Sequence, residues 1–208
     1  MNLLQIIEWS ALKRFVQIGT SDEYGDQDAP QNEKMSARPI SSYSLGKAAA
    51  TELLQTLFRT ESFPCTVLRL FLVYGPGQDN KRFLSQIING CLSNDTFPVS
   101  KGEQLRDFCY IDDIVDGILM SLDNDRVNGE IINIASGKPI SIRDLVEYIN
   151  EVIGQGEPEF DKIPYRKGEN MKLYADIRKA REILDWSPKT SLKKGIELTL
   201  DHYRKRFD

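Results

Sequence analysis

Apolar side chains recur along the first third of the chain in two different patterns. Residues 3–12 and 43–58 carry them at helical spacing, which predicts two amphipathic helices. Residues 15–18 and 66–73 are short, nearly continuous apolar runs, as expected of strands that are buried on both faces of a sheet. The order helix, strand, helix, strand is typical of parallel strands joined by a crossover helix.

The same alternation continues to the end of the chain. The predicted helices cover residues 81–92, 112–122, 141–153, 177–184 and 192–206, and the predicted strands cover residues 106–111 and 130–134. Helices that alternate with buried strands indicate an α/β fold with a parallel sheet. In such sheets ligands bind beyond the carboxyl ends of the strands, so we expect chemistry in the loops at residues 19–25 and 74–77.

The second predicted helix begins with a polar pair. Tyr43 and Lys47 lie four residues apart, so one helical turn places them on the same face. There the ammonium would assist loss of the phenol proton by its charge and by hydrogen bonding, which would make Tyr43 an acid/base group. The other interpretation is a packed ring beside a solvated amine, because this spacing occurs by chance in many helices.

The composition is that of a globular protein. The 208 residues are enough for one sizeable core, or for one domain with a smaller lobe. No apolar run approaches the ~20 residues of a membrane-spanning helix, and a formal net charge of −4 disfavours a nucleic-acid surface. The N-terminus carries neither a basic stretch nor a small-residue cleavage site. We therefore expect a cytoplasmic protein that binds neither membranes nor nucleic acid.

The cysteines and the histidine exclude several kinds of chemistry. Cys65, Cys91 and Cys109 are far apart and form no Cys-x-x-Cys motif, so we expect buried, reduced thiols rather than disulfides or a zinc site. The only histidine, His202, lies in the last predicted helix. A Ser-His-Asp or Cys-His mechanism, or a metal site built on histidines, is therefore not expected.

Several short motifs occur in an order typical of one protein family. They are Thr20-Ser21-Asp22-Glu23-Tyr24-Gly25, Tyr43-x-x-x-Lys47, Leu68-Arg69 with Tyr74-Gly75-Pro76, Arg106-Asp107-Phe108 and Asn133-Ile134-Ala135-Ser136-Gly137. In these motifs the chain resembles the extended short-chain dehydrogenase/reductases, and more narrowly their NAD-dependent sugar-nucleotide epimerases and dehydratases. The similarity spans essentially the whole chain. It implies a Rossmann-like parallel sheet with a smaller C-terminal α+β lobe that binds the substrate.

The resemblance implies roles for five residues near the cofactor. Tyr43 would exchange a proton with a sugar hydroxyl while hydride passes to or from a nicotinamide ring, and Lys47 would hold the cofactor ribose. Thr20 would hydrogen-bond the same sugar oxygen, or it is an ordinary turn hydroxyl. Asp22 matches the acidic position of family dehydratases and decarboxylases, where it would be a further acid/base group, or it caps the loop. Phe71 falls where a backbone group or ring touches the nicotinamide, although a buried strand residue would look identical.

On the substrate side the resemblance points to a nucleotide-diphosphate sugar. Arg106 matches the arginine that meets the diphosphate, a task suited to a planar guanidinium, and its alternative is a surface ion pair with Asp107. In the stretch Arg166-Lys167-Gly168-Glu169, Arg166 would meet the diphosphate and Glu169 a nucleotide ribose. Solvated loop charges are the competing interpretation of this stretch.

Two departures from the family pattern affect what is expected. Leu72 stands where many relatives have an asparagine that contacts the substrate, and no Gly-x-Gly-x-x-Gly or Gly-x-x-Gly-x-x-Gly motif opens an α/β unit. By analogy the chain starts in the helix before the fifth strand of the family sheet, so we expect a partial sheet without its N-terminal strands. Residues 1–75 would be the remainder of the NAD(P)-binding domain, and residues 76–208 mainly the substrate lobe, with residues 108–135 returning to the sheet.

This omission leaves two functions open. The first is an NAD- or NADP-dependent epimerase or dehydratase, and the second is a truncated, inactive relative that has lost cofactor binding and only binds nucleotide sugar or oligomerises. In either case the missing layer would leave the strand at residues 15–18 with a free edge and apolar helix faces uncovered. We therefore expect a homodimer or higher oligomer.

Overall fold

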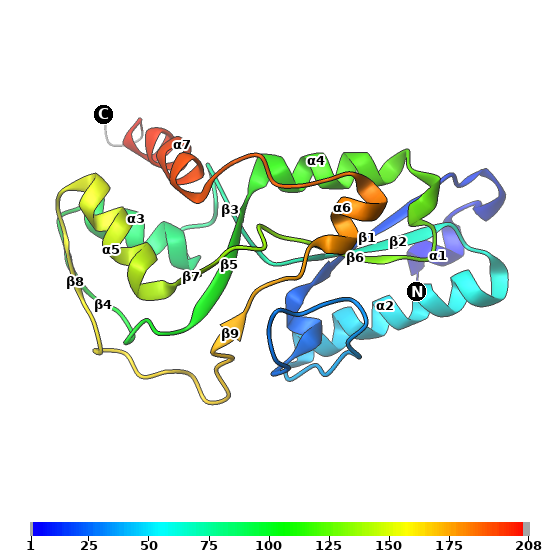
Figure 1. Ribbon diagram of the computed structural model, residues 1–208, viewed down its shortest axis with the longest axis horizontal. Coiled ribbons are helices and arrows are strands. Elements are labelled where there is room, and N and C mark those ends of the chain that lie inside the picture. Colours follow the sequence, from blue (N-terminus) through cyan, green and yellow to red (C-terminus); the bar gives the residue numbers. More distant parts are fainter. Residues whose placement is uncertain (1, 206–208) are drawn as a thin grey trace.

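The central feature of the computed structural model, which describes residues 2–205, is a parallel sheet (Figure 1). Its strands are β1 (Phe15–Thr20), β2 (Cys65–Leu70) and β6 (Ile131–Ile134), in the order β1-β2-β6. Both pairings are parallel. The predicted α/β fold with a partial Rossmann-like sheet is therefore confirmed.

Helices cover both faces of this sheet. Helix α2 (Ser42–Glu61) lies on one face, and α4 (Ile111–Leu122) and α6 (Arg178–Leu184) lie on the other (Figure 1). The predicted helix after residue 42 is confirmed: the Ser41 hydroxyl caps it by accepting from the Ser44 N–H at 3.0 Å. The core between the sheet and α4 contains the fully buried side chains of Leu68, Ile114, Ile132, Ile134 and Trp186.

A second sheet begins where the first one ends. It contains β3 (Leu72–Tyr74), β5 (Leu105–Tyr110), β7 (Pro139–Ser141) and β9 (Lys172–Leu173). The prediction of one strand over residues 66–73 is wrong, because the chain leaves the first sheet at Phe71 and then pairs with β5. The Phe71 N–H still donates to the Ile134 carbonyl at 3.3 Å, while the side chain enters a separate apolar cluster.

The rest of the chain forms a lobe beside the second sheet. It consists of α3 (Phe83–Leu92), α5 (Ile142–Ile153), α7 (Leu192–Arg204) and a small parallel sheet of β4 (Thr96–Pro98) and β8 (Glu157–Glu159) (Figure 1). The buried side chains of Ile88, Leu145, Ile149 and Ile196 fill its core. The three helices were expected from their apolar spacing, and residue 206, at the predicted end of the last one, lies outside the described residues.

The N-terminal segment differs from the single helix predicted over residues 3–12. Helix α1 (Asn2–Ile6) ends early, and a 3₁₀ turn, Trp9–Ala11, follows. The break places the Trp9 ring 4.8 Å from that of Phe63, and the indole N–H donates to the Leu4 carbonyl at 2.9 Å. Two further 3₁₀ turns are η2 (Ser21–Tyr24) and η3 (Asp125–Val127).

The three cysteines are buried and unpaired, as predicted. Among residues 2–205, none of the helices combines the length and apolarity needed to cross a membrane.

Candidate active site

Tyr43 and Lys47 lie on one face of α2, as their spacing predicts. The Lys47 Nζ is 5.9 Å from the centroid of the Tyr43 ring. It donates a hydrogen bond to the Ile18 carbonyl at 2.8 Å, which ties α2 to the carboxyl half of β1. The Tyr43 side chain is 57% exposed. Tyr43 is therefore accessible at the end of the sheet where ligands of α/β proteins bind.

Thr20 ends β1 and begins the η2 turn. Its Oγ1 accepts from the Asp22 N–H at 3.3 Å, while its own N–H donates to Glu23 Oε1 at 3.0 Å, so Thr20 and Glu23 form a reciprocal capping box. The interpretation of Thr20 as a turn hydroxyl is thus correct for its oxygen, which accepts a hydrogen bond within the turn. Its O–H has no acceptor within the described part of the chain and is free to donate to a ligand.

Glu23 is a buried carboxylate that the sequence patterns did not single out. Its Oε2 accepts from Thr51 Oγ1 at 2.9 Å and from Arg69 Nε and Nη2 at 3.1 and 3.0 Å. Thr51 follows Tyr43 and Lys47 on the same stripe of α2, at intervals of four residues. Glu23 therefore joins the Thr20 turn, α2 and β2 at one point.

The sequence contained a signal for this ion pair. Arg69 lies within an almost continuous apolar strand, and a charge at such a position needs a buried partner. Gly19 is a second signal, because a Cβ at that position would lie only 2.7 Å from Glu23 Oε1. Glycine is therefore required for the carboxylate to approach the strand.

A second tyrosine, Tyr24, completes the buried network. Its ring lies 4.5 Å from the Arg69 guanidinium carbon, and its hydroxyl donates to Asn133 Oδ1 at 2.7 Å. Burial raises the pKa of Tyr24 to about 12. This phenol therefore stays protonated and serves as a structural donor, whereas Tyr43 is exposed.

On β5, Arg106 and Asp107 point to different partners. The Arg106 guanidinium pairs with Glu169, so its alternative assignment to an ion pair with Asp107 is wrong. Asp107 instead accepts from the backbone N–H groups of Ser136, Gly137 and Ala175 at 2.8 to 3.1 Å, and from the Ser136 hydroxyl. Burial raises the pKa of Asp107, and these hydrogen bonds oppose that rise.

A substitution of Asp107 therefore tests whether these hydrogen bonds stabilise the fold. We expect Asp107→Asn to lower the free energy of unfolding by about 1–3 kcal/mol. The carboxylate has two acceptor oxygens for its several donors, whereas the amide that replaces it has only one. Urea denaturation would measure the change. Asp26→Asn, at an exposed position, is the control, and equal stability of the two variants would contradict this role.

Asp22 lies within electrostatic reach of Arg106. Burial raises the pKa of Asp22, and the positive charge of Arg106 partly opposes that rise. The structure thus pairs Arg106 with Glu169 and places the charge of Asp22 within electrostatic reach of Arg106. It does not bring Arg166 into this group, because the Arg166 side chain is exposed and only its carbonyl contacts Glu169, accepting from its N–H at 3.0 Å.

Phe71 is the least solvent-exposed of the predicted site residues. Its side chain is only 6% exposed and packs in a cluster with Tyr24, Ala135, Leu173 and Ala175.

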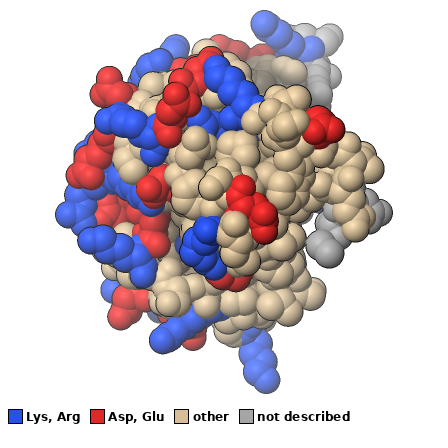
Figure 2. Space-filling model, turned by 90° about the vertical axis from the view of Figure 1, so that its right-hand side faces the viewer, with Lys and Arg blue, Asp and Glu red and all other residues tan. Residues whose placement is uncertain are grey.

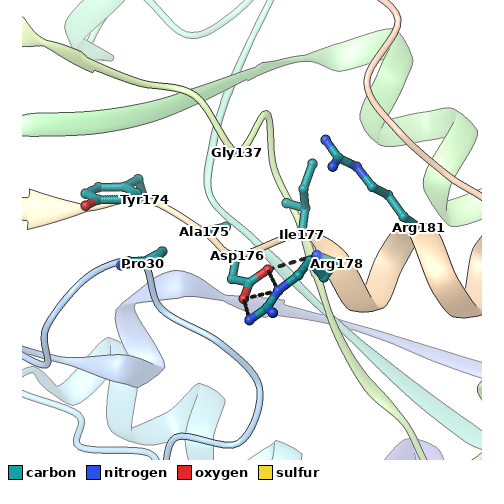
Figure 3. A pocket seen from close by; sticks show the side chains of 8 residues that line it. All are labelled: Pro30, Gly137, Tyr174, Ala175, Asp176, Ile177, Arg178 and Arg181. Atoms are coloured by element: carbon teal, nitrogen blue, oxygen red, sulfur yellow. Dashed lines mark hydrogen bonds and ion pairs between the residues drawn. The ribbon is translucent and has the colours of Figure 1, made fainter.

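A hollow of about 400 Å³ opens beside the start of α6 (Figure 3). Its lining consists of Pro30, Gly137, Tyr174, Ala175, Asp176, Ile177, Arg178 and Arg181. Asp176 binds Arg178 through both oxygens, and the Arg178 guanidinium lowers the pKa of Asp176. Gly137 belongs to one of the family motifs, but none of the predicted site residues lines this hollow.

A parallel sheet with an exposed tyrosine and its lysine partner on the adjoining helix, at the carboxyl end of the strand, defines a chain of the extended short-chain dehydrogenase/reductase class. Within that class, the chain belongs to the family described as GDP-mannose 4,6 dehydratase, whose model matches residues 1–199. The resemblance seen in the sequence motifs is confirmed.

Individual relatives act on UDP sugars. The chain is 30% identical to a UDP-glucuronate 4-epimerase of Thermodesulfobacterium geofontis over 100% of its own length and 64% of the relative. It is 31% identical to UDP-glucuronic acid decarboxylase 6 of Arabidopsis thaliana over 93% of its length and 58% of the relative. The UDP-glucuronic acid 4-epimerase of Bacillus cereus, solved with UDP-glucuronic acid and NAD, superposes with a TM-score of 0.89 at 29% identity, over 99% of this chain and 65% of that one. The chain thus spans about three fifths of the length of these relatives.

Proposed function

We propose that the chain binds a nucleotide-diphosphate sugar and supplies the acid/base group for its NAD(P)-dependent epimerisation or dehydration. The observation that carries this proposal is the position of Tyr43, Lys47 and Thr20 at the carboxyl end of β1. The UDP sugars named for the relatives support a UDP sugar as substrate.

The roles follow from the hydrogen-bonding capacity of these side chains that is left unused within residues 2–205. The Tyr43 hydroxyl takes a proton from a sugar hydroxyl or returns it, and Thr20 donates a hydrogen bond to the same sugar oxygen. Lys47 uses one of its three N–H bonds on Ile18, and within residues 2–205 the other two are free to hold a ribose. Bound NAD or NADP supplies hydride acceptance and return.

Asp22 fits a second proton-transfer role. Its raised pKa means that this carboxyl keeps its proton to a higher pH than an ordinary aspartate does, as a general acid requires. An additional acid favours dehydration or decarboxylation over simple epimerisation.

The residues fit one end of a dinucleotide. Tyr43 and Lys47 suit the nicotinamide ribose, and Phe71 remains the predicted contact of the nicotinamide itself. The sequence of 208 residues contains no glycine-rich motif that would cradle the dinucleotide phosphates at a helix N-terminus. Binding of NAD or NADP by this chain is therefore a separate question from binding of the sugar nucleotide.

Arg106 is the proposed contact of the diphosphate, with Arg166 and Glu169 as further substrate residues. We expect Arg106→Met to weaken UDP binding about 10- to 100-fold, because charge-assisted hydrogen bonds contribute about 1.5–3 kcal/mol. Isothermal titration calorimetry measures this, with the exposed Arg82→Met as control. Equal affinity of Arg106→Met and wild type would show that the diphosphate binds elsewhere.

Calorimetric titration with NAD and with UDP, GDP, CDP and dTDP sugars tests the function as a whole. Binding of both a sugar nucleotide and NAD, with turnover that depends on Tyr43, supports the enzyme. Binding of a sugar nucleotide without NAD supports the alternative of an inactive relative, and binding of neither would refute both.

We also propose a homodimer or higher oligomer, formed through the face of α1, the free edge of β1, and α2. A hollow of about 160 Å³ on this face is lined by Leu3, Leu4, Phe15, Gln17, Ala50, Leu53 and Leu54. Ile6 on α1 is 80% exposed. Figure 2 views the end of the molecule where α1 lies and shows a broad uncharged area beside a charged one. Open sheet edges and apolar patches favour association. A stable monomer at micromolar concentration in sedimentation would contradict this proposal.

Two further proposals follow from the arrangement of the sheets and the thiols. Residues 1–75, with residues 108–135, would form the cofactor side, and the rest of residues 76–208 the substrate side, since β1, β2 and β6 share one sheet.

The three buried free thiols support a cytoplasmic location.

A further inference from the structure

Arg106 already has an anionic partner supplied by the chain itself. One of its terminal nitrogens, Nη2, donates to Glu169 Oε1, and the two side chains are 11% and 20% exposed. The other, Nη1, donates to the Leu105 carbonyl at 2.9 Å. The proposed diphosphate contact is therefore occupied by a carboxylate in this structure.

Glu169 belongs to a loop that is fastened on both sides of it. On the N-terminal side, the Tyr165 hydroxyl accepts from the Glu103 N–H at 3.1 Å. On the C-terminal side, Asn170 Nδ2 donates to the Gly25 carbonyl at 2.8 Å. Between these points, the side chains of Arg166 and Lys167 are exposed. Glu169 thus lies in a short segment between these two fastened points.

The charges around Arg106 argue that the pair must open. Glu169 pairs with the Arg106 guanidinium, and the negative charge of Asp22 also acts on it. A diphosphate that arrived with Glu169 in place would meet an excess of negative charge in a partly buried site, and like charges brought together there are strongly unfavourable. A carboxylate and a phosphate both accept hydrogen bonds from guanidinium donors, so a phosphate that binds Arg106 Nη2 has to replace Glu169 there.

We propose that Glu169 is an internal stand-in for the ligand's diphosphate and gates the Arg106 site. In the ligand-free protein Glu169 holds Arg106 in place, and a diphosphate enters by displacing it. This inference rests on the proposed function, because it takes Arg106 as the diphosphate contact. The proposed gate differs from the role implied by the family resemblance. There Glu169 would contact a nucleotide ribose and so strengthen binding of the sugar nucleotide.

Inorganic pyrophosphate separates these two roles, because it has the phosphates of the ligand and no ribose. Calorimetry would compare wild type with Glu169→Gln, which keeps the size of the side chain and removes its charge. We expect Glu169→Gln to bind pyrophosphate on the order of tenfold more tightly, since the competing anion is gone. Glu151→Gln, which removes one exposed charge elsewhere, is the matched control and should bind as wild type does.

The outcomes distinguish this inference from the proposed function. Pyrophosphate affinity that is unchanged or weaker in Glu169→Gln, with wild type still binding UDP, overturns the gate and leaves the nucleotide-sugar site standing. An equal gain in pyrophosphate affinity in Glu151→Gln also overturns the gate, because the change in net charge would then explain the effect. If neither wild type nor Glu169→Gln binds UDP or pyrophosphate, both the gate and the proposed function are wrong.

Discussion

Replacing Arg69 by methionine is expected to lower the free energy of unfolding by about 3–5 kcal/mol, the usual cost of removing one partner from a buried ion pair. The Glu23 side chain is 0% exposed, and Arg69 donates to its Oε2 from two nitrogens, at 3.0 and 3.1 Å. Without Arg69, the carboxylate keeps only the Thr51 hydroxyl and the Thr20 N–H as donors. Urea denaturation followed by tryptophan fluorescence would measure the loss, because Trp186 is buried in the core.

A matched variant separates burial from the mere presence of an ion pair. Arg59 pairs with Glu52 on the surface of α2, and the two side chains are 57% and 73% exposed. Arg59→Met should change the free energy of unfolding by no more than about 0.5 kcal/mol, as surface substitutions usually do. Equal losses in Arg69→Met and Arg59→Met would contradict the buried network.

Replacing Tyr43 by phenylalanine is expected to reduce turnover of a UDP sugar in the presence of NAD by about 10²- to 10⁴-fold, the usual contribution of an acid/base group. The substitution removes only the hydroxyl of an exposed ring, so fold and UDP affinity should stay the same. Product formation from UDP-glucuronic acid, followed by chromatography, measures turnover, and calorimetry with UDP measures binding.

Tyr174→Phe is the control for Tyr43→Phe. Tyr174 is a half-buried phenol that lines the hollow beside α6 (Figure 3), and it is not one of the proposed site residues. Its loss should leave turnover unchanged. If Tyr43→Phe turned over substrate as fast as Tyr174→Phe, another group would have to move the proton.

Local patterns were enough to predict part of the first half of the fold. Helix α2 matched its predicted extent because a capping serine and an unbroken apolar stripe define it. The strands β1 and β2 were visible as apolar runs, but only β2 is buried, since residues 15–18 of β1 are half-buried. The break at Phe71 was not visible, because residues on both sides of it are apolar and only the pairing of β3 with β5 separates them.

The common face of Tyr43 and Lys47 could also be predicted, since it depends on helical geometry alone. The contact between Arg106 and Glu169 could not, because 63 residues separate them and their meeting depends on β9 pairing with β5. For Arg69, the apolar strand around it signals the need for a buried partner, but not that Glu23, 46 residues away, supplies it. The sequence predicted a contact where both residues lie in one helix. It did not predict a contact where the fold brings two distant segments together.

The central claim is that one nucleotide sugar joins Arg106 to Tyr43. A crystal structure of the chain with bound UDP-glucuronic acid tests it most directly. We predict the diphosphate on the Arg106 guanidinium and a sugar hydroxyl within about 2.6–3.2 Å of the Tyr43 hydroxyl, with Thr20 on the same sugar oxygen. A ligand whose diphosphate lay instead in the hollow beside Arg178 and Arg181, with its sugar away from Tyr43, would contradict the claim.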